Sequence, residues 1–284
     1  MEHVTRTAYF SQLQSAMVRG GAYKWLEHST LNEKFQVLPK EYTPGGVYPI
    51  LSYLAIGRGA LGMFAGADGQ PDMMIHQHKS TDAALFEHMP FVLRTLDNDL
   101  PAERRNRYAL RQQVEFFGIL YWAYWLRRVD FSQADTDLFL KRVLPDGSTQ
   151  VDDFVPDESN LNPTPVDLSD SGTNLLAGYS VIASTIIEIP LDNFDINEIR
   201  NASQIIKRAT GKANITEIAL CTGGVKQIQA QSPTGTFPFN EAIGVQVASH
   251  VQALYALDYI NEALTDKLEL GISEPLFRLE GVNA

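Results

Sequence analysis

The chain has almost no cysteine, since Cys221 is the only one among its 284 residues. A single cysteine cannot form a disulfide within the chain, which predicts that the protein is made and kept in a reducing compartment. The sequence contains no uncharged apolar run near the ~20 residues that a membrane span needs. Its start, MEHVTRTAYFSQLQ, has no basic segment followed by an apolar core. We therefore expect no membrane partner and no conventional secretion signal.

Positive charge is absent from residues 143–199, which contain no Lys or Arg but eleven Asp and Glu residues. These eleven account for the whole net charge of -11, because the rest of the chain has 23 basic and 23 acidic residues. A negative net charge repels phosphate, and no stripe of interleaved basic and aromatic residues is found. We therefore expect no nucleic acid partner.

A basic cluster precedes this acidic span, with nine Lys and Arg residues between positions 94 and 142. Opposite charges in adjacent regions favour contacts between copies of a chain, and head-to-tail contacts of this kind can close into rings. The residues that we expect at this contact are Arg104, Arg105, Arg107, Asp152, Asp153 and Asp157. The alternative is that both regions are solvated faces of a monomer.

Three glycines at positions 57, 59 and 62 have the G-x-G-x-x-G spacing of a dinucleotide-binding turn. That turn must lead into a helix, but the next residues include Gly66, Gly69 and Pro71, which interrupt any helical period. The motif therefore does not predict a dinucleotide site. It favours a segment whose small residues allow close approach of backbone, within the chain or against another subunit.

The chain divides into four segments by composition. Residues 1–72 predict an N-terminal helix and an extended glycine-rich arm with little regular structure, and residues 73–153 predict an antiparallel β region. Residues 154–175 form an acidic loop or linker rich in Pro, Asp and Ser, and residues 176–284 an α+β region that packs with residues 73–153. We predict an α+β fold, mainly antiparallel β-sheet with a few helices.

Several elements can be given bounds. A helix is predicted over 4–28, and a turn at 145–147 predicts a β-hairpin. A second helix is expected over 195–212, with Asp195 as its N-cap and an apolar stripe of isoleucines. Further strands are predicted over 178–191, 215–223 and 241–254.

The run ILYWAYWLRRV, residues 119–129, is a strand with large apolar side chains on both faces. Tyr121 and Trp125 lie on one face, and Trp122 and Tyr124 on the other. Both faces must therefore be covered. A central strand within one chain satisfies this, and so does a strand placed between subunits, because aromatic residues are enriched in interface cores.

The segment MIHQHK places His76 and His78 two residues apart, on the same face of a strand if a strand forms there. Such a pair can bind a metal when a third ligand joins it, such as Asp82, Glu87 or His88. The alternative is a pair of partly exposed histidines without a metal. No other motif specifies catalysis, so we expect no catalytic residue, no cofactor and no metal.

Four stretches resemble structural proteins encoded among the tail and neck genes of tailed bacteriophages. They are AYFSQLQSAMVRGGAYKWL at 8–26, YTPGGVYP at 42–49, NEIRNASQIIKRATGKANITEIALCTG at 197–223 and LELGISEPLF at 268–277. The resemblance spans most of the chain but contains no catalytic or ligand-binding motif. It carries over no functional residue.

The resemblance implies a multicopy virion protein, made in the cytoplasm of the bacterial host, whose partners are copies of itself in a ring and other tail, baseplate or neck proteins. A baseplate location is the first expectation. Two other functions stay open: a soluble cytoplasmic enzyme that uses a metal at His76 and His78, and a module that binds a host surface.

Overall fold

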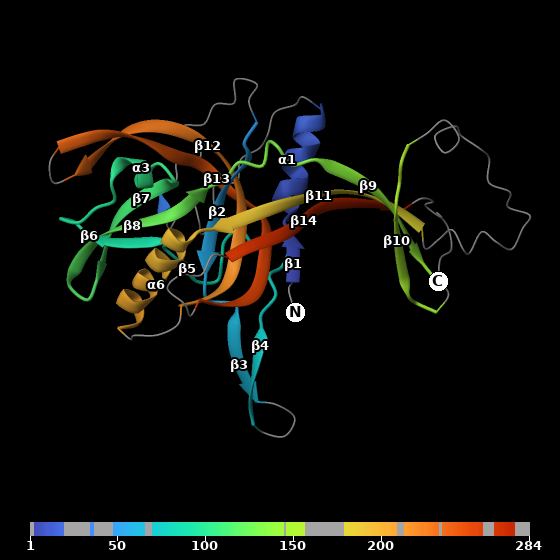
Figure 1. The fold of residues 1–284 in the computed structure, drawn as a ribbon, viewed down its shortest axis with the longest axis horizontal. Helices are drawn as coiled ribbons and strands as arrows, with labels where there is room; N and C mark the ends of the chain where they lie inside the picture. The colour runs from blue at the N-terminus through green and yellow to red at the C-terminus, as the bar shows by residue number, and fades with distance from the viewer. Residues whose placement is uncertain are drawn as a thin grey trace, which may run out of the picture. The chain divides into compact units, whose positions relative to one another are not determined.

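The computed structural model describes residues 3–19, 35–36, 48–65, 70–144, 146–156, 179–208, 213–232, 235–257 and 264–275. The chain forms two compact units. One consists of Met1–Asp130 and Leu191–Leu264, and the other of Phe131–Pro190 and Thr265–Ala284 (Figure 1). The boundaries between the units lie inside the predicted segments 73–153 and 176–284. None of the described helices is long and apolar enough to cross a membrane.

The first unit is built on an eight-stranded sheet in which the paired strands are antiparallel. Its main path runs through β1 (His3–Arg6), β13 (Gly235–Leu257), β12 (Ala213–Ser232), β2 (Ile50–Gly57), β8 (Ile119–Arg128) and β6 (Val92–Thr95). In addition, β5 (His88–Met89) pairs with β2, and β7 (Tyr108–Phe116) pairs with β8. The prediction of a mainly antiparallel sheet is confirmed.

The strand β2 corrects one prediction about the N-terminal arm. The arm predicted within residues 1–72 was expected to have little regular structure, but β2 lies between β12 and β8 and its last five residues are buried. The apolar sequence ILSYLAIG of this strand suits burial on both faces. Between residues 36 and 72 the structure describes residues 36, 48–65 and 70–72. The other residues of this stretch lie outside the described residues.

The N-terminal helix begins later than predicted. Residues 3–6 form β1, in which Val4 pairs with Val251 of β13, and the helix α1 then runs over Ala8–Arg19. Between them, the hydroxyl of Thr7 donates to the Val247 carbonyl at 2.7 Å, which fixes the start of α1 on β13. Leu13 of α1 is buried, whereas Met17, one turn further along the helix, is 42% exposed. Residues 20–28 of the predicted helix lie outside the described residues.

The aromatic run lies in β8, which forms a hairpin with β7, and both of its faces are covered within the chain. Phe117 and Gly118 have φ angles of 56° and 79°, as in the two-residue type I′ turn that joins twisted strands. On one face Trp125 packs against Phe35, with ring centroids 4.8 Å apart, and on the other the Arg111 guanidinium lies 3.3 Å from the centre of the Trp122 ring. The four aromatic residues are 0–8% exposed, namely Tyr121, Trp122, Tyr124 and Trp125. Internal burial leaves little of these side chains for another subunit to contact.

The helix α6 (Asn193–Lys207) carries the predicted apolar stripe, since Ile196 and Ile199 are fully buried. The N-cap prediction is wrong by three residues. Asp192 is the N-cap and accepts from the Asp195 backbone N–H, while the Asp195 side chain accepts from the Asp192 N–H in a reciprocal capping box. The short helix α3 (Ala102–Arg105) precedes β7 in the same unit.

The second unit contains a four-stranded sheet in the order β10 (Thr149–Asp153), β9 (Thr136–Val143), β11 (Tyr179–Leu191) and β14 (Leu264–Pro275), in which β9 pairs antiparallel with both β10 and β11. The predicted hairpin is confirmed, because Val143 pairs with Thr149 around a turn in which Gly147 has a φ of 82°. The strand predicted over 178–191 is β11. Most of the predicted linker lies outside the described residues, which resume at 179.

Candidate functional site: a buried histidine–carboxylate cluster at the root of a projecting hairpin

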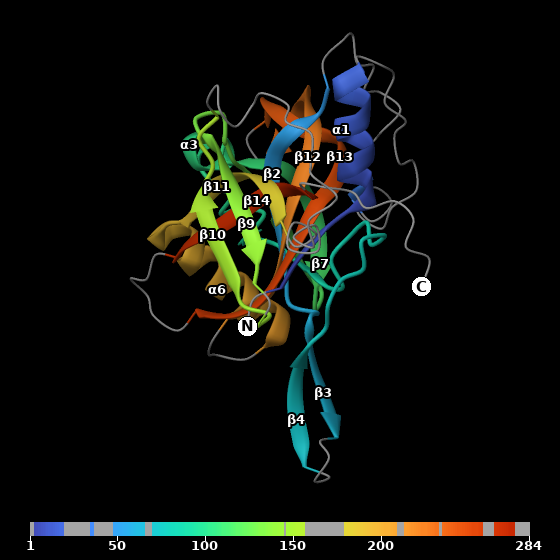
Figure 2. The same ribbon diagram turned by 90° about the vertical axis from the view of Figure 1, so that its right-hand side faces the viewer.

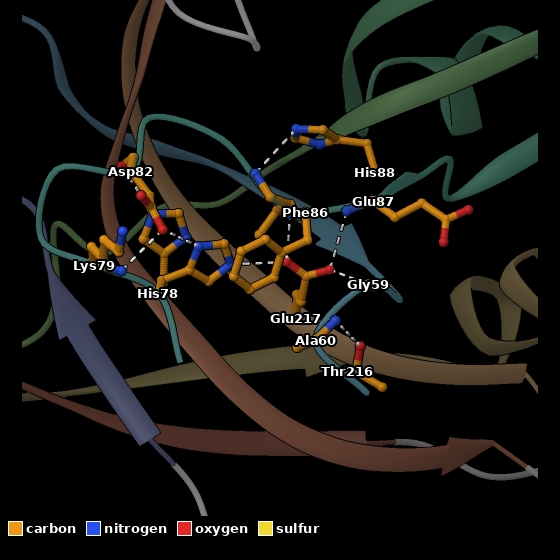
Figure 3. A network of polar contacts seen from close by, with 12 residues as sticks. Gly59, Ala60, His78, Lys79, Asp82, Phe86, Glu87, His88, Thr216 and Glu217 are labelled. Atoms are coloured by element: carbon orange, nitrogen blue, oxygen red, sulfur yellow. Dashed lines mark hydrogen bonds and ion pairs between the residues drawn. The ribbon is translucent and has the colours of Figure 1, made fainter. Parts of the chain in front are cut away.

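A carboxylate lies at the centre of the sheet in the first unit. Glu217 of β12 pairs with Gly57 of β2 on one side and Gln252 of β13 on the other, and it is fully buried. Its Oε1 atom accepts from the Gly59 N–H at 2.6 Å, and its Oε2 atom accepts from the Phe86 N–H at 2.8 Å (Figure 3). These hydrogen bonds compensate for the loss of water around a buried charge.

His78 connects this carboxylate to a second one. Its Nε2 atom lies 2.9 Å from Oε2 of Glu217, and its Nδ1 atom lies 3.0 Å from Oδ2 of Asp82 (Figure 3). Only the imidazolium form donates through both ring nitrogens, so the geometry matches a cation held between two carboxylates. The ring also stacks on Phe86 at 3.9 Å, which keeps water from this face.

Asp82 and His250 complete the histidine–carboxylate cluster, which we define as His78, Asp82, Glu217 and His250. Burial opposes ionisation of Asp82, but hydrogen bonds from the Lys79 backbone N–H and from His78 outweigh it and lower the pKa of this carboxyl. His250 is fully buried and stacks on His78 at 3.9 Å.

His250 is neutral in this arrangement. Its Nε2 atom lies 3.1 Å from the Asp82 carbonyl oxygen, which can only accept, so Nε2 carries the proton. Its Nδ1 atom is buried without a hydrogen-bond partner among the described residues. Burial first, and the adjacent His78 second, lower the pKa of His250 to about 4. The cluster thus holds one neutral imidazole against one that bridges two carboxylates.

The three glycines of the G-x-G-x-x-G pattern lie where residues 76–88 cross the chain. A Cβ atom at Gly57 would be 2.6 Å from the Glu87 carbonyl oxygen, and one at Gly59 would be 2.7 Å from the Glu87 nitrogen. At Gly62 it would collide with the His76 ring. The glycine pattern predicted close approach of backbone, either within the chain or against another subunit. These contacts show close approach within the chain.

A hairpin formed by β3 (Leu61–Ala65) and β4 (Pro71–Ile75) begins and ends beside this crossing of residues 76–88. The Ala60 N–H donates to the hydroxyl of Thr216 at 3.1 Å, and its carbonyl accepts from the His76 N–H at 2.7 Å. Because Thr216 and Glu217 are adjacent on β12 and both are buried, the hairpin starts at a buried part of the sheet. Figures 1 and 2 show β3 and β4 projecting away from that sheet.

The hairpin exposes three methionines, which are Met63 at 69%, Met73 at 60% and Met74 at 44%. Met63 and Met73 are directly opposite one another in the ladder, so they share one face. Leu61 and Ile75 are also paired and lie on this face by the alternation of side chains. One side of the hairpin is therefore an apolar surface that projects into solvent.

His76 and His78, the pair on which the alternative metal site depends, are separated. β4 ends at Ile75, and in the irregular segment that follows His76 is exposed whereas His78 is buried, so the two do not share the face of a strand. Asp82, one of the predicted third ligands, does contact His78. In the part of the chain that the structure describes, no group of three or more His, Cys, Asp or Glu residues is placed to hold a metal ion.

The basic residues expected at a contact between copies have acidic or aromatic neighbours in their own unit. The Arg107 guanidinium lies 2.9 Å from the Asp192 carboxylate and 2.6 Å from that of Asp195. Arg105 pairs with Asp99 at 3.2 Å, and the Arg104 guanidinium lies 4.4 Å from the centre of the Phe194 ring.

The acidic side of the expected contact is also partly neutralised. Arg94 pairs with Glu198 through two hydrogen bonds, and Asp152 pairs with Arg142 at 2.8 Å within the β9–β10 hairpin. Asp153 is exposed, and Asp157 lies outside the described residues. Charge complementarity between the basic and acidic spans thus acts in part within one chain.

Two apolar stretches of the sequence each contain one residue of the cluster. Glu217 is the one charged residue in the apolar run ITEIALCTG, and His250 lies in the similar run VASHVQAL. A charged or titratable residue at an inward position of an apolar strand must be paired when the strand is central. Their partners could not be identified, because Glu217 is 139 residues from His78.

Comparison with known proteins gives a family without an assigned role. A family model described as a family of unknown function (DUF7208) matches residues 1–284. No curated protein and no solved structure matches the chain.

Proposed function

We propose, for a chain that belongs to this family of unknown function, the role of a structural subunit in a symmetric tailed-phage assembly. The tail or baseplate is the first location and the neck the second. Its partners would be copies of itself in a ring and other virion proteins, and its place would be the virion after synthesis in the host cytoplasm.

The projecting β3–β4 hairpin is the observation that carries this proposal. An isolated two-stranded hairpin is marginally stable in water, and an exposed apolar face adds a further cost. Here the hairpin starts beside Thr216 and Glu217, whose buried hydrogen bonds fix residues 59 and 60. A rigid root combined with an exposed methionine face is what a subunit needs to present a contact surface to a neighbour.

The sequence supports the same role, through its resemblance to phage tail and neck proteins. The proposal does not rest on the basic and acidic spans, because Arg107 is committed to Asp192 and Asp195 of its own chain. It also does not rest on the aromatic strand, since less than a tenth of Trp122 or Trp125 is exposed.

The two alternatives make different demands on the same residues. A metal enzyme at His76 and His78 would need these side chains to converge, yet His78 directs both ring nitrogens at carboxylates. A host-surface module would use the hairpin to bind a molecule from another cell and needs no self-association.

The mass of the purified chain in solution, measured together with its metal content, separates these functions. A structural ring subunit is expected to form concentration-dependent oligomers without stoichiometric metal. A stable monomer that carries one metal per chain would contradict the proposal and favour the enzyme. A metal-free monomer that binds host cells would favour the host-surface module.

A further inference from the structure

The β4 end of the hairpin continues into an irregular segment that buries little of its own surface. We call residues 76–83 the strap, and the structure describes every one of them. His78 is the only buried residue of the strap, whereas Ala84 and Leu85, which follow it, belong to the core of the unit. Opening the strap therefore removes one side chain from the interior. Segments with so few buried contacts open at a small fraction of the cost of global unfolding.

The side chain of His78 is the main attachment of the strap to the sheet. It lies 2.9 Å from the Glu217 carboxylate on β12, and 3.0 Å from that of Asp82 in the strap itself (Figure 3). The Asp82 carbonyl accepts from His250 of β13 at 3.1 Å. The middle of the strap is thus fastened to the two central strands through groups whose charges depend on pH.

Uncharged groups at the start of α1 also contact the strap. The Ala8 N–H donates to the Ser80 carbonyl at 2.8 Å, and the Tyr9 hydroxyl donates to the Thr81 carbonyl at 2.6 Å. These bonds resist opening, but they do not involve the histidine–carboxylate cluster. A change in the charge of that cluster therefore acts on the other side of the strap, where it lies on β12 and β13.

The closed strap requires a neutral His250. The Nε2 proton of His250 is used by the Asp82 carbonyl, and its Nδ1 atom is buried without a partner among the described residues. A second proton would make Nδ1 a buried donor without an acceptor. It would also place a cation 3.9 Å from the ring of His78, which is itself a cation between two carboxylates.

The charged groups around His250 come from the strap and from β12. They are His78, Asp82 and Glu217. β1 places Thr5, which does not titrate, opposite His250, and α1 has no charged residue except Arg19 at its end. The carboxylates favour a proton on His250, but burial and His78 oppose it more strongly and lower its pKa to about 4. Because His78 belongs to the strap, this opposition ends when the strap opens.

We propose that protonation of His250 releases the strap from the sheet and frees the β4 end of the hairpin, while the sheet stays folded. The β3 end keeps its attachment, because the Gly59 N–H donates to Glu217 and the Ala60 N–H to Thr216. The β4 end depends on the strap that follows it. The hairpin therefore becomes mobile about its β3 root in acid. This device does not rest on the proposed function.

The size of the effect follows from the two environments of His250. With a pKa of about 4 under the closed strap and about 6.5 once exposed, acidification from pH 7 to pH 5 raises the opening equilibrium about 20-fold. His78 acts in the opposite direction, because the closed strap holds it as a cation. This opposition is at most about fourfold over the same range, since an exposed histidine is itself protonated at pH 5. The wild-type strap should therefore open about fivefold more at pH 5 than at pH 7.

Amide hydrogen exchange followed by mass spectrometry at pH 7 and pH 5 tests the inference, with each rate divided by the intrinsic rate at that pH. The variant His250→Gln does not titrate, and its amide can donate to the Asp82 carbonyl. In peptides that cover residues 76–83, opening should rise on acidification in the wild type and should not rise in this variant. Peptides from β12 and β13 should stay protected in both proteins.

The matched control is His76→Gln, because His76 is an exposed histidine of the same strap. Its backbone bond to Ala60 remains, so this variant should respond to acid as the wild type does. If His250→Gln does not fold, His250→Met provides the same comparison, since methionine does not titrate and adapts to the space that it fills.

Three results would overturn the inference. The first is a wild-type strap whose protection does not fall at pH 5. The second is a loss of protection that reaches β12 and β13 equally, which would be global unfolding. The third is an equal response of the wild type and the His250 variant, which would assign the release to another group. Exchange is measured on the isolated chain, so none of these results bears on its presence in virions.

Discussion

Acidification should destabilise the protein through His250. The pKa of this buried imidazole is about 4 in the folded chain, compared with about 6.5 in an unfolded one. Between these values the unfolded state binds more protons than the folded state, so the free energy of unfolding falls as pH falls. A difference of roughly 2.5 pKa units corresponds to about 3 kcal/mol, lost between pH 6.5 and pH 4.

The groups around His250 shift its pKa in opposite directions, and the net effect lowers the pKa. His78 stacks against its ring, so protonation of His250 would place two cations 3.9 Å apart. The Asp82 carbonyl, which His250 contacts, and the carboxylates of Asp82 and Glu217, which bond to the ring nitrogens of His78, favour a cation at His250, but less strongly than burial and His78 disfavour it. The lowered pKa of Asp82 makes its own contribution fall only below about pH 4.

The assay is urea unfolding at pH 7, 6, 5 and 4 for the wild type and for His250→Gln. The glutamine amide does not titrate and can donate to the Asp82 carbonyl that His250 now contacts. The other titratable groups are common to both proteins. We expect the wild type to lose about 3 kcal/mol more than the variant over this range. Parallel pH dependences would refute the account of His250 as a buried neutral imidazole.

Three further substitutions test other contacts by urea unfolding at pH 7. Glu217→Gln places an amide N–H group among N–H donors and should lower the free energy of unfolding by about 3 kcal/mol. An unchanged urea midpoint would mean that the carboxylate is not needed for stability. Gly59→Ala should cost about 1–3 kcal/mol because its Cβ would collide with the Glu87 nitrogen; a gain in stability, as at an unstrained glycine, would contradict this packing. Arg107→Ala should cost about 2 kcal/mol and Arg104→Ala less than about 1 kcal/mol, because Arg107, together with Arg127, bonds to the buried Asp195 whereas Arg104 lies over the Phe194 ring; equal losses would argue against the Arg107–Asp195 ion pair.

Local patterns in the sequence predicted several of the longer regular elements, but not β2 or the β3–β4 hairpin. The aromatic strand, the β9–β10 hairpin and α6 follow from side-chain alternation, turn residues and an apolar stripe. The turn between β7 and β8 was missed because Phe117 adopts a left-handed conformation that Asn or Gly usually takes. The sequence FFG therefore gave no turn signal.

The candidate site could not be predicted in the same way, because it depends on contacts between distant residues. His78 and Glu217 meet only when the segment after β4 crosses β2 and β12, and the sequence does not encode that crossing in a local period. The spacing of the glycines at 57–62 can be read from the sequence, but the structural reason for these glycines cannot. It follows from the close passage of Glu87 and His76.

The composition of purified phage particles tests the central claim most directly. Quantitative mass spectrometry of particles from a phage that encodes this chain should find it in a fixed number of copies, a multiple set by the symmetry of the tail, baseplate or neck. Absence of the chain from intact particles, with the protein recovered only in the soluble fraction of the lysate, would contradict the role of structural subunit.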